Sequence, residues 1–204
     1  MTVGGQVFRG GVLFTVFAGP NRPILHALFQ ILQPVNALGT FTMSTLTATE
    51  LAWLNDPVLG INADRARYSA APLVFDEYSV EAARYWAAYE GSHGWYGHVC
   101  PATDASCVST LTFLKQKPGF IFGGGQNLDV GVTADWPYSE ARIMAESANC
   151  PNGSPTGCVF AENTGHFLNL VNQNLQFIGL GVFNGGKAFN GSPQTMNYLV
   201  QDFG

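Results

Sequence analysis

The stretch that most constrains the fold of this chain is residues 163–182, NTGHFLNLVNQNLQFIGLGV. Apolar residues at 167–171 are spaced for one face of a short helix, and residues 177–182 have the pattern of a buried strand. Gly165 and His166 stand where a loop passes into that helix. One histidine is therefore held between a loop and a core strand. A lone histidine beside apolar residues is more often structural, so the rest of the chain must supply partners for any site.

The whole chain is long enough for one domain, residues 46–204, after an N-terminal extension, residues 1–45. Charged residues make up 11% and apolar residues 47%, with 24 glycines, which is typical of a compact, loop-rich globular protein. The net charge is -5, and the basic residues form no cluster. Because a nucleic-acid surface needs such a cluster, we expect no nucleic-acid partner.

The extension contains two apolar runs, residues 11–19 and 24–32. Both are too short to cross a bilayer, which takes roughly 20 residues, so no transmembrane helix is expected. The second run, followed by Val35-Asn36-Ala37, is similar to a signal peptide with a small-residue cleavage site. Alternatively, both runs dock on the domain, on a neighbouring protein or on a membrane. A mature protein that begins at Leu38 would show that the signal-like segment is cleaved.

The four cysteines form two close pairs in loop sequence, Cys100 with Cys107 and Cys150 with Cys158. Neither pair has CxxC spacing, so two local disulfides are favoured over a structural zinc site. Four cysteines allow three connectivities, and free thiols are a further alternative. Disulfides imply an oxidising compartment, and hence a secreted, periplasmic or cell-surface protein.

Local signals predict most of the helices and strands. A capping box from Thr47 to Glu50 opens one helix, and Asp76 caps the longest one. The expected helices are residues 47–54, 62–68, 77–90, one or two turns within 109–114, and a helix from Asp135 or Ser139 to about 148; the expected strands are 71–75, 177–182 and 197–203. The glycine run at 123–125 lacks the lysine and spacing of a phosphate-binding loop.

Six short motifs follow one another between residues 49 and 204: NADR at 62–65 with APLVFD at 71–76, WYGH at 95–98, GQNL at 125–128, GHFLNL at 165–170, IGLGV at 178–182 and YLVQDFG at 198–204. Their order and spacing resemble the CAP superfamily, which includes cysteine-rich secretory proteins, antigen 5 and plant pathogenesis-related proteins, in its bacterial secreted form. The resemblance implies an α/β fold, a three-layer α/β/α sandwich with a small, mostly antiparallel central sheet.

The resemblance also implies a cleft lined by two histidines and two acids. His98 and His166 match the histidines, and Glu146, in a motif similar to the family's W-x-x-E, matches one acid. Gln126 stands where the family usually has glutamate, with Asn127 beside it. Glutamine keeps an oxygen acceptor but carries no charge and exchanges no proton. Hydrolysis by a pair of carboxyl groups is therefore disfavoured.

Two histidines across a cleft suit Zn²⁺ or another divalent metal, so the resemblance implies His98 and His166 as metal ligands, with Glu146 or water completing the shell. The alternative is that both rings hydrogen-bond to Glu146, Gln126 and backbone without a metal. The sequence leaves both open.

Three functions follow from these expectations. The first is a secreted or envelope-associated, non-catalytic CAP-like domain that binds a small ligand, lipid, glycan or protein. The second is a metal- or His/Glu-dependent hydrolase of peptide or cell-wall glycan, with Glu146 as its base and His98 and His166 as metal ligands or proton carriers. The third is a structural subunit of a surface assembly that docks through residues 1–45.

Overall fold

The computed structural model describes residues 7–8, 11–12, 46–115, 124–132, 135–189 and 193–204. The chain divides into two units, Met1–Leu46 and Thr47–Gly204. In the first unit, β1 (Val7–Phe8) pairs antiparallel with β2 (Gly11–Val12). The second apolar run and the cleavage-site sequence lie outside the described residues, so both alternatives for the extension stay predictions. Among the residues that were described, no helix is long and apolar enough to cross a membrane.

The second unit holds the domain. Its helices are α1 (Ala48–Asn55), α2 (Ile61–Arg67), α3 (Glu77–His93), α4 (Thr110–Lys115), α5 (Trp136–Ala145) and α6 (Gly165–Leu170), with short 3-10 helices η2 (Glu146–Asn149) and η3 (Pro151–Gly153). Its strands are β3 (Val74–Phe75), β4 (Gln126–Gly131), β5 (Phe177–Gly186) and β6 (Met196–Phe203).

The predicted caps are confirmed. Thr47 accepts a hydrogen bond from the Glu50 amide, and the Glu50 carboxylate accepts one from the Thr47 amide, which completes the capping box of α1. Asp76 caps α3, which ends where Gly94 takes a left-handed φ of 66°. Asp135, not Ser139, caps α5.

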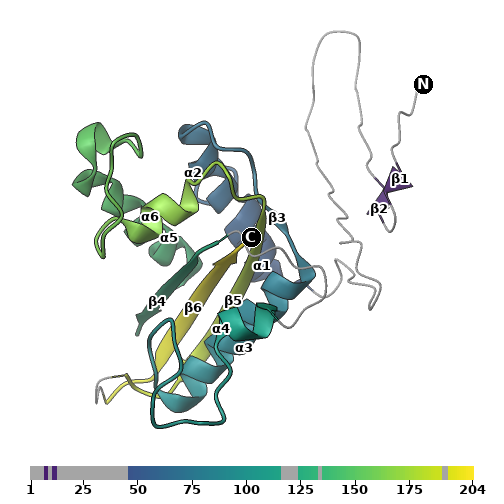
Figure 1. Ribbon diagram of the computed structural model, residues 1–204, viewed down its shortest axis with the longest axis vertical. Coiled ribbons are helices and arrows are strands. Elements are labelled where there is room, and N and C mark those ends of the chain that lie inside the picture. Colours follow the sequence, from purple (N-terminus) through teal and green to yellow (C-terminus); the bar gives the residue numbers. More distant parts are fainter. Residues whose placement is uncertain (1–6, 9–10, 13–45, 116–123, 133–134, 190–192) are drawn as a thin grey trace. The chain divides into compact units, whose positions relative to one another are not determined.

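The sheet has the strand order β3-β5-β6-β4 (Figure 1). β3 runs parallel to β5, while β5 with β6 and β6 with β4 are antiparallel. The expected α/β fold with a small, mostly antiparallel sheet is therefore confirmed. Within the predicted strand 71–75, only Val74–Phe75 (β3) pairs with another strand. β5 continues beyond its predicted end at residue 182, because its pairing with β6 continues to Gly186.

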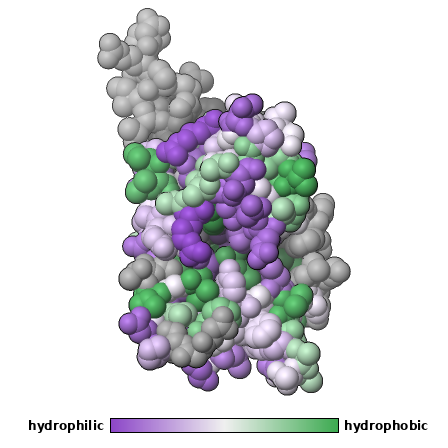
Figure 2. Space-filling view, turned by 90° about the vertical axis from the view of Figure 1, so that its left-hand side faces the viewer, coloured by the Kyte–Doolittle hydropathy of each residue, from purple (hydrophilic) through white to green (hydrophobic). Residues whose placement is uncertain are grey.

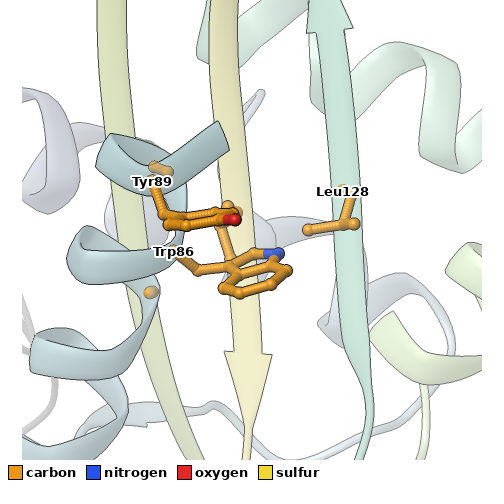
Figure 3. Close-up of a cluster of buried hydrophobic side chains, with 6 residues drawn as sticks. Trp86, Tyr89 and Leu128 are labelled. Atoms are coloured by element: carbon orange, nitrogen blue, oxygen red, sulfur yellow. The ribbon is translucent and has the colours of Figure 1, made fainter. Parts of the chain in front are cut away.

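α3 covers one face of the sheet. Trp86 and Tyr89 stack with ring centroids 5.2 Å apart, and Leu128 on β4 points toward them (Figure 3). Along β5, a Cβ added at Gly179 or Gly181 would collide with the backbone of α3. The glycines of the IGLGV motif thus let the helix pack directly on the strand backbone.

The other face packs against further helices (Figure 1). Glu140 of α5 accepts hydrogen bonds from Trp53 of α1 at 2.9 Å and from Gln201 of β6 at 3.0 Å. Arg65 of α2 is also fully buried, and burial lowers its pKa to about 10. Its guanidinium donates to four backbone carbonyls, those of Ala71, Leu170, Asn172 and Leu175.

Both local disulfides are confirmed. Cys100 is bonded to Cys107, and Cys150 is bonded to Cys158. The alternatives of free thiols, of other pairings and of a cysteine zinc site are therefore wrong.

Candidate binding pocket

A pocket of about 480 Å³ opens where α4, α6 and the ends of β4 and β6 meet. Five polar residues, two glycines and two apolar residues line it. The polar residues are His98, Thr110, Gln126, Asn169 and Asp202; the glycines are Gly124 and Gly125; the apolar residues are Val99 and Phe160.

Gln126 links the polar groups of the pocket. Its Nε2 donates to Asp202 Oδ1 at 2.9 Å and to the Thr110 hydroxyl at 3.0 Å. Its Oε1 lies 2.9 Å from His98 Nδ1. Because the amide nitrogen is committed to Asp202 and Thr110, the oxygen must accept, so His98 Nδ1 carries a proton. The neutral imidazole then keeps a lone pair on Nε2.

Asp202 is a buried acid at this pocket, with only 2% of the residue exposed. Burial raises its pKa to about 8, and the hydrogen bond from Gln126 opposes that rise. Within the described part of the chain, no partner reaches its Oδ2. The carboxyl group is therefore mostly protonated at neutral pH, and one of its oxygens is unused.

Glu90 of α3 is a second buried acid near Asp202, and it is 0% exposed. Burial raises its pKa to about 8; the amide of Gly97, which donates to its Oε1 at 3.0 Å, opposes the rise, and the charge of Asp202 adds to it. Its Oε2 likewise has no hydrogen-bond partner among the residues described. Two acids with unused oxygens thus lie between α3 and β6.

Glu146 and His166 form a separate pair. His166 Nδ1 lies 2.6 Å from Glu146 Oε1, and the Phe167 amide donates to Glu146 Oε2 at 3.1 Å. Asn127 contacts this pair through the backbone, because its Nδ2 donates to the His166 carbonyl at 3.0 Å. None of Asn127, Glu146 and His166 is among the residues that line the pocket.

The hydrogen bonds thus join the predicted cleft residues in two groups. Gln126 and Asn127 are neighbours on β4, so their side chains point to opposite faces of the sheet. Gln126 meets His98 in the pocket, while Asn127 meets the segment that holds His166. The sequence prediction missed Asp202. Its alternation with Tyr198 and Val200, which places an acid on the core face of β6, was the signal that would have found it.

Comparison with known protein families matches residues 60–203 to CAP, the cysteine-rich secretory protein family. The chain belongs to this family. The crystal structure of MpPR-1i is similar, with a TM-score of 0.44 and 12% identity over 76% of this chain and 84% of that chain. A crystal structure of MpPR-1i soaked with selenourea has a TM-score of 0.39 and 11% identity over 70% and 83% of the two chains. No curated protein matches the chain. The CAP match confirms the resemblance drawn from the motifs.

The metal expected from the resemblance can be compared with the donor atoms of the CAP domain. His98 and His166 each use Nδ1 in a hydrogen bond, which leaves Nε2 oriented as in a metal-ligating histidine. However, within the described ranges no group of three or more His, Cys, Asp or Glu side chains could hold a metal ion. These residues do not fit a centre with three protein ligands, so the metal stays a prediction and no step below depends on one.

Proposed function

We propose that this CAP domain is a secreted or envelope-associated binding protein that holds a small ligand in the pocket between His98, Asp202 and Phe160, without catalysing a reaction. The observation that carries the proposal is the pocket itself, with Gln126 fixed between His98 and Asp202. Members of the family are typically secreted and generally bind small ligands or proteins, which supports this assignment.

The polar groups of the pocket favour binding over hydrolysis. Glycoside hydrolysis by the usual route needs two carboxyl groups that flank the reacting bond. Here the position facing His98 is a glutamine, whose amide transfers no proton. Glu146, the predicted base, does not line the pocket, and both its oxygens accept hydrogen bonds from the His166 segment.

The mouth of the pocket is apolar. Val99 and Phe160 line it and are 66% and 67% exposed. Each lies beside a disulfide, Val99 next to Cys100 and Phe160 two residues after Cys158. Hydrogen-bonding groups below an apolar mouth suit a ligand that has a polar head and an apolar body.

Hydrophobic residues on the face in Figure 2 form separate small patches between hydrophilic ones. A stable protein interface normally has a larger contiguous apolar centre. The coloured residues of this face therefore offer no such apolar centre for a partner. The assembly hypothesis depends on residues 1–45, most of which lie outside the described ranges.

The second candidate is the hydrolase. One observation favours it: Asp202 is an acid with a raised pKa in the same pocket as a histidine, and general acids have this property. In this case His98 would activate water.

A titration of the full chain tests the binding function. Three probes share a phenyl body and differ in the head group: 2-phenylethanol, 3-phenylpropionate and 2-phenylethylammonium. We expect at least one to bind, and Phe160→Ala to weaken it about fivefold, since the ring contact is worth about 1 kcal/mol. Val58→Ala is the matched control, because Val58 is 61% exposed and does not line the pocket.

The same samples test for catalysis. Incubation with a fluorogenic peptide library and with peptidoglycan should give no product above the buffer blank. Turnover that His98→Ala abolishes would establish the hydrolase instead. If no probe binds at millimolar concentration, or if Val58→Ala weakens binding as much as Phe160→Ala, the pocket is not the binding site.

A further inference from the structure

The loop after α3 carries two residues of the pocket lining, His98 and Val99. Two side chains of α3 bind the residue just before them. Glu90 Oε1 accepts a hydrogen bond from the Gly97 amide at 3.0 Å, and the Trp86 indole donates one to the Gly97 carbonyl at 3.1 Å. Residues 86 and 90 lie four apart, so they share one face of the helix. One turn of α3 thus holds both backbone polar groups of Gly97.

Other contacts hold the start of the same loop. The Trp95 amide donates to the Glu90 carbonyl at 3.1 Å, and the Tyr96 hydroxyl donates to the Leu128 carbonyl of β4 at 3.0 Å. The rings of Trp95 and Tyr96 pack against the core cluster of α3. The Trp95 indole reaches forward to the Val99 carbonyl at 3.0 Å. The side-chain contacts of α3 with Gly97 therefore lie closest along the backbone to the residues that line the pocket.

The acid that makes this contact has one oxygen without a partner. Glu90 is 0% exposed, and no hydrogen-bond partner reaches its Oε2 among the described residues. Burial raises its pKa to about 8, the charge of Asp202 adds to the rise, and the Gly97 amide opposes it. Tyr96 and Tyr198 also interact with Glu90, but their own pKa values are raised, so both stay neutral below pH 9. Glu90 and Asp202 are therefore the groups that titrate between α3 and β6.

We propose that Glu90 is a positioning residue of the pocket, which holds the loop of His98 in place through Gly97 as long as its buried carboxyl group keeps a proton. The proposal rests on the proposed binding function and adds the control of one pocket wall. Glu90 is not among the residues that line the pocket, so it acts on a ligand only through the position of the loop.

The proton links the position of the loop to pH. When the loop opens, Glu90 meets water, where a glutamate has a pKa of about 4.3. Between that pH and about 8 the closed loop keeps a proton that the open loop has lost, so the closed state weakens as pH rises, by up to about tenfold per unit. The loss is complete above about pH 8. In Glu90→Gln the amide keeps an acceptor for Gly97 and has no proton to lose.

The first test is hydrogen exchange of the Gly97 amide in the full chain, with the disulfides intact. Glu90→Met has a side chain of similar length with only a weak sulfur acceptor, so at pH 6 it should exchange this amide about tenfold faster than the unaltered protein. Glu90→Gln should stay within about twofold of the unaltered protein, because the amide keeps an acceptor. Glu140→Gln is the matched control, because Glu140 is also a buried acid whose pKa is raised to about 8, but it bonds to Trp53 and Gln201 instead.

A pH series of the same measurement isolates the proton. At each pH the exchange rate of the unaltered protein is divided by that of Glu90→Gln, which cancels the intrinsic pH dependence of exchange. We expect this ratio to rise at least about tenfold from pH 6 to pH 8 and then to level off. The ratio to Glu140→Gln should stay constant. Asp202 is present in all these proteins, so the rise reports on Glu90.

The second test asks whether the loop matters to the pocket. The ligand is whichever of 2-phenylethanol, 3-phenylpropionate and 2-phenylethylammonium binds the unaltered protein most tightly at pH 7. Glu90→Met should weaken its binding about fivefold, because only the closed fraction of the protein binds. Glu90→Gln should restore the affinity to within about twofold, and Glu140→Gln should not change it.

The outcomes separate the two proposals. If Gly97 exchanges no faster in Glu90→Met than in Glu140→Gln, or if the ratio to Glu90→Gln does not change with pH, Glu90 does not position the loop. Faster exchange with unchanged affinity would mean that the positioning role is wrong while the pocket remains a binding site. If no probe binds the unaltered protein, the binding function fails, and exchange alone decides whether Glu90 holds Gly97. If Glu90→Met does not fold, the pH series with Glu90→Gln still decides this.

Discussion

Glu140 of α5 is a buried acid, only 2% exposed. Its replacement by glutamine tests whether the folded protein keeps a proton on this side chain. Its Oε2 accepts hydrogen bonds from Trp53 and Gln201, and within the described residues no donor reaches its Oε1. Burial raises the pKa of Glu140 to about 8, and the nearby carboxyl group of Asp64 adds to the rise. The native protein therefore holds a proton on Glu140 at neutral pH.

The direction of the pH effect follows from this proton. In the unfolded chain a glutamate has a pKa of about 4.3. Between that pH and about 8 the folded state holds a proton that the unfolded state has lost, so stability falls as pH rises. The contribution of Glu140 is complete below about pH 4.3 and is lost as the pH rises through 8.

The magnitude has an upper limit of about 5 kcal/mol, since the pKa rises by about 3.5 units and each unit corresponds to about 1.4 kcal/mol. Burial also raises the pKa of Asp64, so the two groups share the cost and Glu140 alone accounts for only part of it. We expect a loss of about 2 to 3 kcal/mol between pH 5 and pH 8.5 from this residue.

Glu140→Gln imitates the protonated acid. The amide oxygen accepts from Trp53 and Gln201, and the amide nitrogen donates toward Asp64. At pH 5 the variant should match the unaltered protein within about 1 kcal/mol, and at pH 8.5 it should be more stable by about 2 to 3 kcal/mol. Glu90 and Asp202 titrate equally in both proteins, so they cancel in the difference.

The assay is urea unfolding with the disulfides intact, followed by tryptophan fluorescence at pH 5, 7 and 8.5. The measured quantity is the difference in free energy of unfolding between the two proteins at each pH. Parallel pH profiles for the two proteins would refute the reasoning, because they would show that Glu140 does not hold a proton in the folded state.

Three further changes test the packing. Gly181→Ala places a methyl group against the carbonyl of Ala83, so we expect little soluble, folded protein on expression, as judged by the soluble fraction and circular dichroism. Arg65→Lys keeps the charge but cannot reach four carbonyls, and it should lower the free energy of urea unfolding by about 3 kcal/mol. Replacing Cys150 and Cys158 by serine should lower it by about 2 to 3 kcal/mol and also weaken probe binding in the titration.

Features fixed by local interactions were predictable from the sequence. The capping box at Thr47 and the cap at Asp76 need only residues within one turn, and both disulfides close short loops. Features fixed by long-range contacts were less predictable from the sequence. α5 ends at Ala145, three residues before the predicted end, because the chain tightens into η2. The family motifs implied a small, mostly antiparallel sheet, but the strand order β3-β5-β6-β4 was not predicted.

The candidate site shows the same division. The resemblance identified His98, Gln126, Glu146 and His166 but treated them as one cleft. The hydrogen bonds join them as two pairs, His98 with Gln126 and Glu146 with His166, and the shared cleft stays a prediction. The motifs could not show these pairs, because the pairs depend on where the loop with His98 and helix α6 lie against the sheet. Asp202 lies opposite Gln126 in the pairing of β4 with β6, a contact that only the folded sheet makes.

The glutamine at position 126 also explains why Asp202 is the acid of this pocket. A glutamate there would place a second carboxyl group where the Gln126 amide now lies, 2.9 Å from Asp202 Oδ1. Two carboxyl groups at that distance cannot both ionise and would share one proton, as catalytic acid pairs do. The amide donates to Asp202 instead, and its oxygen lies 2.9 Å from His98 Nδ1, so one neutral side chain joins the acid to the histidine. A single glutamine thus removes the second carboxyl group that proton transfer by an acid pair would need.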